Sequence, residues 1–115
     1  MNEIVLTKDS DALICVLYRE YLQRREAGAS KRDAKWFGGA EHIQAAFIPK
    51  WSIEDVAETC WELSRAGLLA CQPGDNTVTM AVLEDCGITY MEGRFKGNLK
   101  KVLEYISKLI PILPL

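Results

Sequence analysis

Apolar residues in the first quarter of the chain recur at the spacing of an amphipathic helix. They lie three or four positions apart, at Leu13, Val16, Leu17 and Tyr21. This spacing places them on one helical face. Thr7 can cap the free N–H groups at the start of such a helix, and Gly28 suits the position after its end. The pattern therefore predicts a helix over residues 8–26, preceded by a short extended run at residues 4–6.

Two shorter helices are predicted in the next stretch of the chain. Ser30 and Asp33 have the spacing of a capping box, which starts a helix that continues through Phe37. A further helix is predicted over residues 40–47. Pro49 ends it, because proline has no backbone N–H and disfavours a helical conformation of the residue before it.

The central helix is predicted to run from Ser52 to Ala66. Ser52 is a favoured N-cap residue, and Gly67 suits the position after the helix C-terminus. Apolar side chains recur at helical spacing on the side expected to face the core, at Ile53, Val56, Ala57, Cys60 and Leu63. Carboxylates recur at every fourth residue on the opposite side, at Glu54, Glu58 and Glu62. This helix is therefore expected to expose an acidic face.

Two strands are predicted after the central helix. Residues 77–83 alternate between larger apolar and smaller or polar side chains, which is the period of a half-buried strand. Residues 69–72 form a second candidate strand. The residues between the two runs, Pro-Gly-Asp-Asn at 73–76, are typical of a tight turn. The stretch is therefore predicted to form a β-hairpin.

The last third of the chain returns to a helical pattern, which predicts one long helix over residues 84–110. Its apolar stripe has one offset near Gly97, where the helix is expected to bend. A single small domain has difficulty burying the whole stripe, so part of it is predicted to form a homodimer interface. The predicted interface residues are Met91, Phe95, Leu99, Val102, Ile106 and Leu109. The alternative is that the helix folds back onto the first helix and buries the stripe within the chain.

The composition predicts one folded domain over residues 1–115, and the helices and strands predicted above make it α+β and mostly helical. Of the 115 residues, 49% are apolar and 26% are charged, which is ordinary for a folded protein. The sequence contains no apolar run long enough to span a membrane. Its N-terminus lacks the basic and apolar regions of a signal peptide, so a cytoplasmic location is expected.

The cysteines and the histidine show no pattern typical of a catalytic or metal site. The four cysteines include no closely spaced pair, and His42 is the one histidine, whereas zinc sites need about four S or N ligands. The cysteines are expected to act as small buried hydrophobes. Trp36, Trp51 and Trp61 could stack on nucleic-acid bases, but their apolar neighbours favour core or interface positions. We therefore expect no enzymatic activity, no metal and no cofactor.

Two motifs resemble those of a known superfamily, the winged helix-turn-helix. Residues 62–69, Glu-Leu-Ser-Arg-Ala-Gly-Leu-Leu, resemble its L-x-x-x-G-L-[LI] exit from the third helix. Residues 83–90, Leu-Glu-Asp-Cys-Gly-Ile-Thr-Tyr, resemble its L-T-x-x-G-x-x-[YF] opening of the helix after the wing, with Glu84 where many relatives carry threonine or serine. The chain is also similar to small bacterial and prophage proteins of the YjcQ type. The resemblance covers about residues 8–110 and implies a two- or three-stranded wing followed by a long C-terminal helix.

The resemblance implies a DNA-binding transcriptional regulator with double-stranded DNA as its partner. In such proteins the third helix, which corresponds here to the central helix, enters the major groove. Basic residues supply most of the affinity. Here residues 51–92 hold eight acids and the single base Arg65, whereas residues 19–35 hold six bases and three acids. The candidate DNA contacts are Arg24, Arg25, Lys31, Arg32, Lys35 and Arg65. The alternative for residues 24–35 is that they form a solvated face.

A second functional hypothesis follows from the same distribution of charge. The acidic face of the central helix would repel DNA phosphates, and it would suit a basic protein partner. The chain would then be a non-catalytic protein-interaction module, acting as a dimeric adaptor that does not bind DNA. The sequence leaves both hypotheses open.

Overall fold

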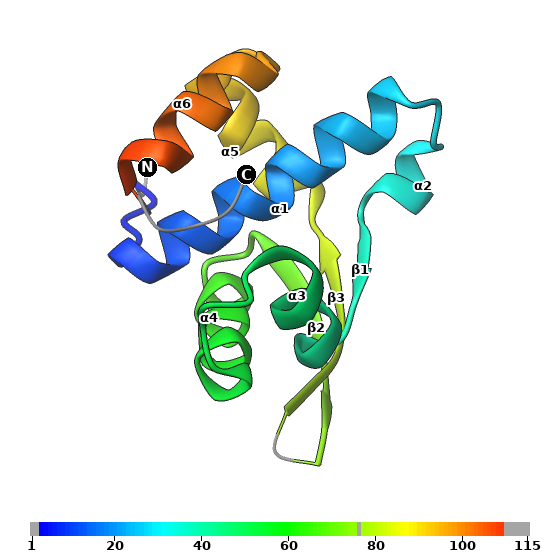
Figure 1. Ribbon diagram of the computed structural model, residues 1–115, viewed down its shortest axis with the longest axis vertical. Coiled ribbons are helices and arrows are strands. Elements are labelled where there is room, and N and C mark those ends of the chain that lie inside the picture. The colour runs from blue at the N-terminus through cyan, green and yellow to red at the C-terminus, as the bar shows by residue number, and fades with distance from the viewer. Residues whose placement is uncertain (1–2, 76, 110–115) are drawn as a thin grey trace.

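The computed structural model describes residues 3–75 and 77–109 as six helices and a small sheet (Figure 1). The helices are α1 Lys8–Glu26, α2 Lys31–Ala34, α3 Ala40–Phe47, α4 Ile53–Arg65, α5 Asp85–Phe95 and α6 Leu99–Leu109. The strands are β1 Trp36–Gly38, β2 Leu69–Gly74 and β3 Thr77–Leu83. The protein is thus α+β and mostly helical, as its sequence predicts. Within the described residues, no helix is long and apolar enough to cross a membrane.

Helix α1 forms the centre of the molecule. It lies between the α5–α6 pair on one side and α3, α4 and the sheet on the other (Figure 1). All its residues from Ala12 to Arg19 are buried. The sequence predicts one apolar face, but elements pack on both sides of α1 and enclose the helix in this stretch. Burial raises the pKa of the Cys15 thiol to about 12, which makes this cysteine an inert core residue.

The three strands form an antiparallel sheet in the order β1-β3-β2. The predicted hairpin is confirmed, since β2 and β3 pair over most of their length. The prediction of helix through Phe37 is wrong: α2 ends at Ala34, and Trp36 pairs with Val82 of β3. Distant β3 supplies the pairing partner, so local spacing could not reveal β1. Residues 4–6, which are predicted to be extended, belong to no strand.

Side-chain caps fix three helix starts at the predicted residues. The hydroxyls of Thr7, Ser30 and Ser52 each accept a hydrogen bond from the backbone N–H three residues later, at 3.0–3.1 Å. Two helix ends are followed by Gly28 and Gly67, with φ angles of 99° and 81°. Glycine adopts this left-handed conformation without the steric cost that a side chain brings.

Removing the cap of α4 is expected to destabilise the whole domain. The change Ser52→Ala leaves the N–H of Asp55 without its partner and should lower the free energy of unfolding by about 1 kcal/mol. Urea denaturation of both proteins measures this difference. Ser64→Ala, within the same helix, serves as the control and should be nearly neutral. Equal unfolding midpoints for Ser52→Ala and the unchanged protein would contradict the capping role.

The predicted long C-terminal helix is broken into two helices. Lys96 and Gly97 adopt positive φ angles of 56° and 68°, which end α5 and reverse the chain. Asn98 then caps α6, because its side chain accepts from the backbone N–H of Lys101 at 3.2 Å. The offset in the apolar stripe marks the right place, but a full break replaces the expected bend. Residue 110, the last of the predicted helix, lies outside the described residues.

The break lets α6 fold back onto α1, which corrects the predicted dimer interface. Met91, Phe95, Val102 and Ile106 are all at least 93% buried inside the chain. Leu99 and Leu109 are half-buried. An interface through these side chains would require the core to open. The structure therefore favours the alternative, in which the stripe is covered intramolecularly.

A polar network fastens both C-terminal helices to α1. Asp11 of α1 accepts hydrogen bonds from Arg94 of α5 and from the Tyr105 hydroxyl of α6, each at 2.5 Å. The guanidinium of Arg94 also lies over the rings of Tyr90, Phe95 and Tyr105, at 4.9–5.6 Å from their centroids. The bond to Asp11 raises the pKa of the Tyr105 phenol. One carboxylate thus joins three helices.

Candidate functional site

The predicted basic residues of the first 35 positions gather around the short helix α2. The tight turn at Gly28 folds α2 back beside the C-terminal end of α1 (Figure 1). We call the set the basic surface; it comprises Arg24, Arg25, Lys31, Arg32 and Lys35. Three of these line a hollow of about 640 Å³, called here the Trp36 hollow. Its lining residues are Arg24, Arg32, Asp33, Lys35, Trp36 and Val82.

Arg24 lines this hollow and is fixed there by hydrogen bonds to the protein. Its guanidinium donates to the backbone oxygen of Trp36 at 2.6 Å and to Glu20 at 2.9 Å. It also lies over the ring of Phe37, 4.7 Å from the centroid. Arg24 was predicted as a DNA contact, but it already has protein partners and is half-buried. Its first role is to hold β1 against α1.

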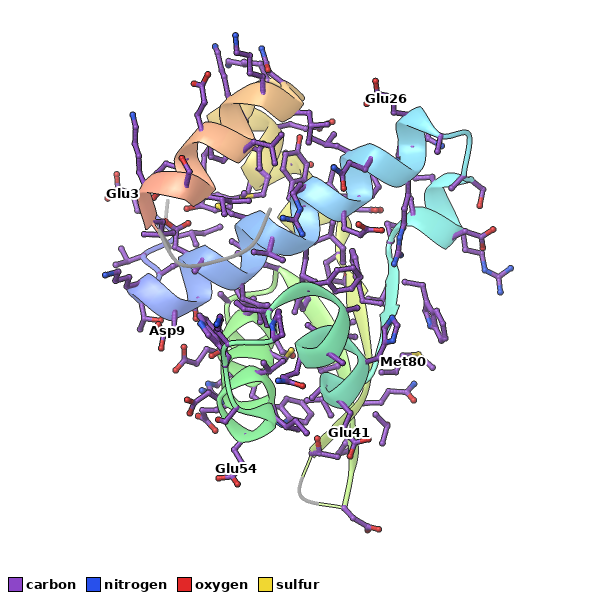
Figure 2. The ribbon with its side chains drawn as sticks, viewed as in Figure 1. Glu3, Asp9, Glu26, Glu41, Glu54 and Met80 are labelled. Carbon is purple, nitrogen blue, oxygen red and sulfur yellow. The ribbon has the colours of Figure 1, made fainter. Side chains whose placement is uncertain are left out.

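Trp36 lies on the open side of the sheet. Trp36 is 51% exposed, which corrects the core position predicted for this residue, whereas an interface position stays a prediction; Trp51 and Trp61 are half-buried. The register sets Trp36 beside Val82, and Val82 beside Ala70, in one row across the three strands. Helices α3 and α4 cover the other face, and Met80 points away from them (Figure 2).

Of the remaining cations of the basic surface, Arg25, Lys31 and Lys35 lie close to α5. Arg25 and Lys31 line a second, smaller hollow. Lys35 donates to Asp85 at 3.1 Å, and this hydrogen bond lowers the pKa of the Asp85 carboxyl. Arg32 is exposed at the edge of the Trp36 hollow. The structure therefore brings together five of the six predicted contact residues, although acids lie among them.

Arg65, the sixth predicted contact, lies apart from this group. It is on α4, where it pairs with Glu58 at 3.7 Å in an exposed position. The neighbouring Glu62 meets α1 near its start, through a bond from Ser10 at 2.6 Å. Ser10 and Arg24 are separated by about 20 Å along α1, at 1.5 Å per residue. Arg65 and the basic surface thus belong to different regions.

The exposed side of α4 is acidic, with one correction to the predicted stripe. Glu54 and Glu58 are exposed, and Glu54 points into solvent at the N-terminal end of α4 (Figure 2). Glu62 instead accepts bonds from Thr7 and Ser10 and is half-buried. Ile53, predicted to face the core, is 40% exposed because it is the first residue of the helix.

The residues with catalytic or metal-binding chemistry are scattered. His42 is exposed, and its ring meets Phe47 edge-on at 5.9 Å. Cys15 and Cys60 are buried as expected, Cys71 is half-buried, and Cys86 is exposed, contrary to the prediction. Among residues 3–75 and 77–109, no three His, Cys, Asp or Glu side chains gather in a metal-binding arrangement. The Trp36 hollow is therefore the strongest candidate site.

Comparisons with protein-family models, with curated proteins and with solved structures found no match to this chain. The chemistry of its surfaces must therefore carry any functional conclusion. Trp36 is the main residue whose exposure the sequence pattern did not indicate. Its apolar neighbours favour burial, and the one available signal was its position two residues before a glycine pair, where a chain can turn into an edge strand.

Proposed function

We propose that this chain is a winged helix-turn-helix protein that binds double-stranded DNA as a transcriptional regulator. The order α1, β1, α3, α4, β2, β3 supports this fold, because helices α3 and α4 are joined by a short turn and followed by a hairpin. The sheet order β1-β3-β2 supports it as well. The hairpin projects past α3 and α4 as a wing would (Figure 1).

The observation that carries the proposal is the clustering of cations on one corner of the protein. Five basic side chains, from α1, α2 and Lys35, line two hollows: Arg24, Arg32 and Lys35 the first, and Arg25 and Lys31 the second. Arg25, Lys31 and Arg32 are exposed. Contacts between such side chains and phosphates supply most of the sequence-independent affinity for DNA. We therefore propose that the basic surface, and not α4, contacts the DNA backbone.

Helix α4 is a poor candidate for groove insertion despite its position in the fold. Its exposed acids Glu54, Asp55 and Glu58 would lie close to phosphates, with Arg65 as the opposing base. The hairpin adds Asp75 near its tip. Like charges at close range lower affinity, so these side chains would weaken a groove contact.

A protein-interaction module is the second candidate, and the surface of α4 favours it. The exposed Ile53 begins α4, directly before the exposed acids Glu54 and Asp55, with exposed Glu58 in the next turn. Such a surface would suit a basic protein segment with an apolar residue at its centre. In that case the basic surface would remain solvated, and duplex DNA would not bind.

A salt series on a mixed-sequence duplex tests the DNA-binding proposal. Affinity should fall steeply as salt rises, because bound cations release the counterions of DNA. The triple change Arg25→Glu, Lys31→Glu and Arg32→Glu should reduce affinity at least about tenfold at low salt, as several phosphate contacts become repulsive. Arg24 is left intact because its bond to Trp36 supports β1. Fluorescence anisotropy provides the measurement.

The control for the salt series is Glu58→Ala on α4. This change removes an exposed acid and should leave DNA affinity equal or higher. A loss of affinity in Glu58→Ala would indicate that α4 contacts the DNA after all. Absence of duplex binding even at low salt would overturn the proposal and favour the protein-interaction module.

A further inference from the structure

Trp36 is a large aromatic side chain held in an exposed position. The exposed large hydrophobic side chains among residues 3–75 and 77–109 are Ile4, Val5, Trp36 and Ile53. Trp36 is the one aromatic residue in this set, and the one that belongs to a strand. An indole that is half in water forgoes part of the burial free energy of its large surface. Such a residue is a candidate binding platform.

The backbone that carries Trp36 is held on both sides. Leu83 donates to the oxygen of Lys35 at 2.8 Å, so the main-chain groups of Lys35 face β3. In an antiparallel pair these groups alternate, which turns those of Trp36 toward the outer edge of the sheet. There Arg24 binds the Trp36 oxygen at 2.6 Å. Both the strand pairing and Arg24 therefore hold the platform.

The same contact argues against an extended peptide as the ligand. A peptide that adds to a sheet edge needs the outward carbonyl and N–H groups of the edge strand. Arg24 already occupies the outward carbonyl of Trp36. Strand β1 is also only three residues long. A ligand that stacks on the face of the indole needs neither group.

The hollow beside the indole suits a nucleotide in size and charge. Its volume of about 640 Å³ lies within the range of roughly 300–1,000 Å³ usual for small-molecule sites. Arg24, Arg32 and Lys35 line it together with Asp33. Arg24 also binds Glu20 and Lys35 also binds Asp85, so Arg32 is the cation of the lining with the most freedom to reach a ligand. A flat aromatic group next to cations is the arrangement by which proteins bind single-stranded nucleic acid: bases stack and phosphates pair with the cations.

We infer that the Trp36 hollow binds a single-stranded segment of nucleic acid. One base stacks on the Trp36 indole, and the adjoining phosphates contact Arg32 and Lys35. Stacking on Trp36 reads no base edge, so binding here is tolerant of sequence. The inference rests on the proposed DNA binding and adds the form of the substrate: a duplex end or opened region with unpaired bases binds better than a blunt duplex.

Binding of a fluorescent twelve-residue oligothymidylate and of a blunt mixed-sequence duplex, compared by anisotropy, tests the inference. Trp36→Ala should weaken oligothymidylate binding about tenfold, within the range found for one base–aromatic stack. Trp36→Phe keeps an aromatic face and should retain most of the affinity. Duplex affinity should change less than about twofold in both variants, because phosphate contacts dominate there.

Two matched controls separate binding in the Trp36 hollow from the loss of any exposed apolar side chain or any arginine. Ile53→Ala removes another exposed apolar side chain, on α4, and should leave oligothymidylate binding unchanged. Arg32→Gln should weaken it, whereas Arg65→Gln, which changes an exposed arginine outside the hollow, should not. Circular dichroism of Trp36→Ala checks that the sheet is retained.

The outcomes distinguish this inference from the proposed function. Duplex binding together with no oligothymidylate binding, or with unchanged oligothymidylate binding in Trp36→Ala, would overturn the inference and leave the proposed function standing. If neither the oligothymidylate nor the duplex binds, both the inference and the proposed function are overturned. A polyglutamate peptide could also bind as tightly as the oligothymidylate and lose affinity in Trp36→Ala. That result would identify an acidic-peptide site and overturn the inference.

Discussion

Replacing Gly87 by alanine is expected to lower the free energy of unfolding by about 3 kcal/mol, because the added methyl group meets fixed backbone. A Cβ at this position would lie 2.5 Å from the carbonyl oxygen of Leu68 and 3.1 Å from the side chain of Leu83. The Leu68 oxygen cannot retreat without cost, since it accepts a hydrogen bond from Glu84 at 3.0 Å. Helix α5 would have to move away from the start of β2.

Gly93 provides the matched control for this change. It lies in the same helix, and a Cβ built there meets no atom within 4 Å. Gly93→Ala should therefore raise the stability by roughly 0.5–1 kcal/mol through helix propensity. Urea denaturation of both variants gives the comparison. If Gly87→Ala were as stable as Gly93→Ala, α5 would not pack against Leu68 as closely as described.

The packing of Gly87 also affects the basic surface. Asp85 is the first residue of α5, and it binds Lys35 at 3.1 Å. A displaced α5 would separate this pair and alter the second hollow, which α5 lines through Ile88, Thr89 and Glu92. The close approach of Gly87 to Leu68 thus sets the position of one wall of the candidate DNA-binding region.

Replacing Asp11 by alanine is expected to cost about 3 kcal/mol, the lower end of the roughly 3–5 kcal/mol seen when one partner of a buried ion pair is removed. The side chains of Asp11 and Arg94 are 17% and 23% exposed, so water screens the pair only in part. The change leaves both the Arg94 guanidinium and the Tyr105 hydroxyl without their acceptor. Thermal and urea unfolding measure the loss.

Asp9→Ala separates this network from the general effect of an acid near a helix N-terminus. Asp9 and Asp11 both belong to the first turn of α1, but Asp9 is exposed at its outer end (Figure 2). Its removal should cost only about 0.5 kcal/mol, the usual value for such a charge. Similar losses in Asp9→Ala and Asp11→Ala would show that Asp11 does not fasten α5 and α6 to α1.

The intramolecular position of α6 changes how the functional hypotheses stand to each other. The predicted homodimer used the apolar stripe from Met91 to Leu109 under either functional hypothesis, whereas most of that stripe lies in the core. Two exposed surfaces among residues 3–75 and 77–109 can still serve a partner: the acidic face of α4 and the basic surface with Trp36. DNA binding through the basic surface uses the second of these and requires no dimer.

Local chemistry in the sequence determined where most elements begin and end. The hydroxyl caps at Thr7, Ser30 and Ser52 and the glycines at 28 and 67 act within a few residues of each helix end. Such interactions depend only on neighbours in the chain, so spacing alone predicts them. The bounds of α1 and α3 and the β2–β3 hairpin follow for the same reason.

Tertiary structure alone decided which apolar and charged side chains are covered. Trp36 is exposed because β1 pairs with distant β3 at the edge of the sheet. Met91 is buried within the chain, and not in a dimer interface, where α6 reverses onto α1. Glu62 does not belong to the exposed acidic face of α4, because its carboxylate accepts a hydrogen bond from Ser10 of α1. Burial depends on elements that lie far away in the sequence. Periodicity predicts only which side of its own helix or strand a side chain lies on.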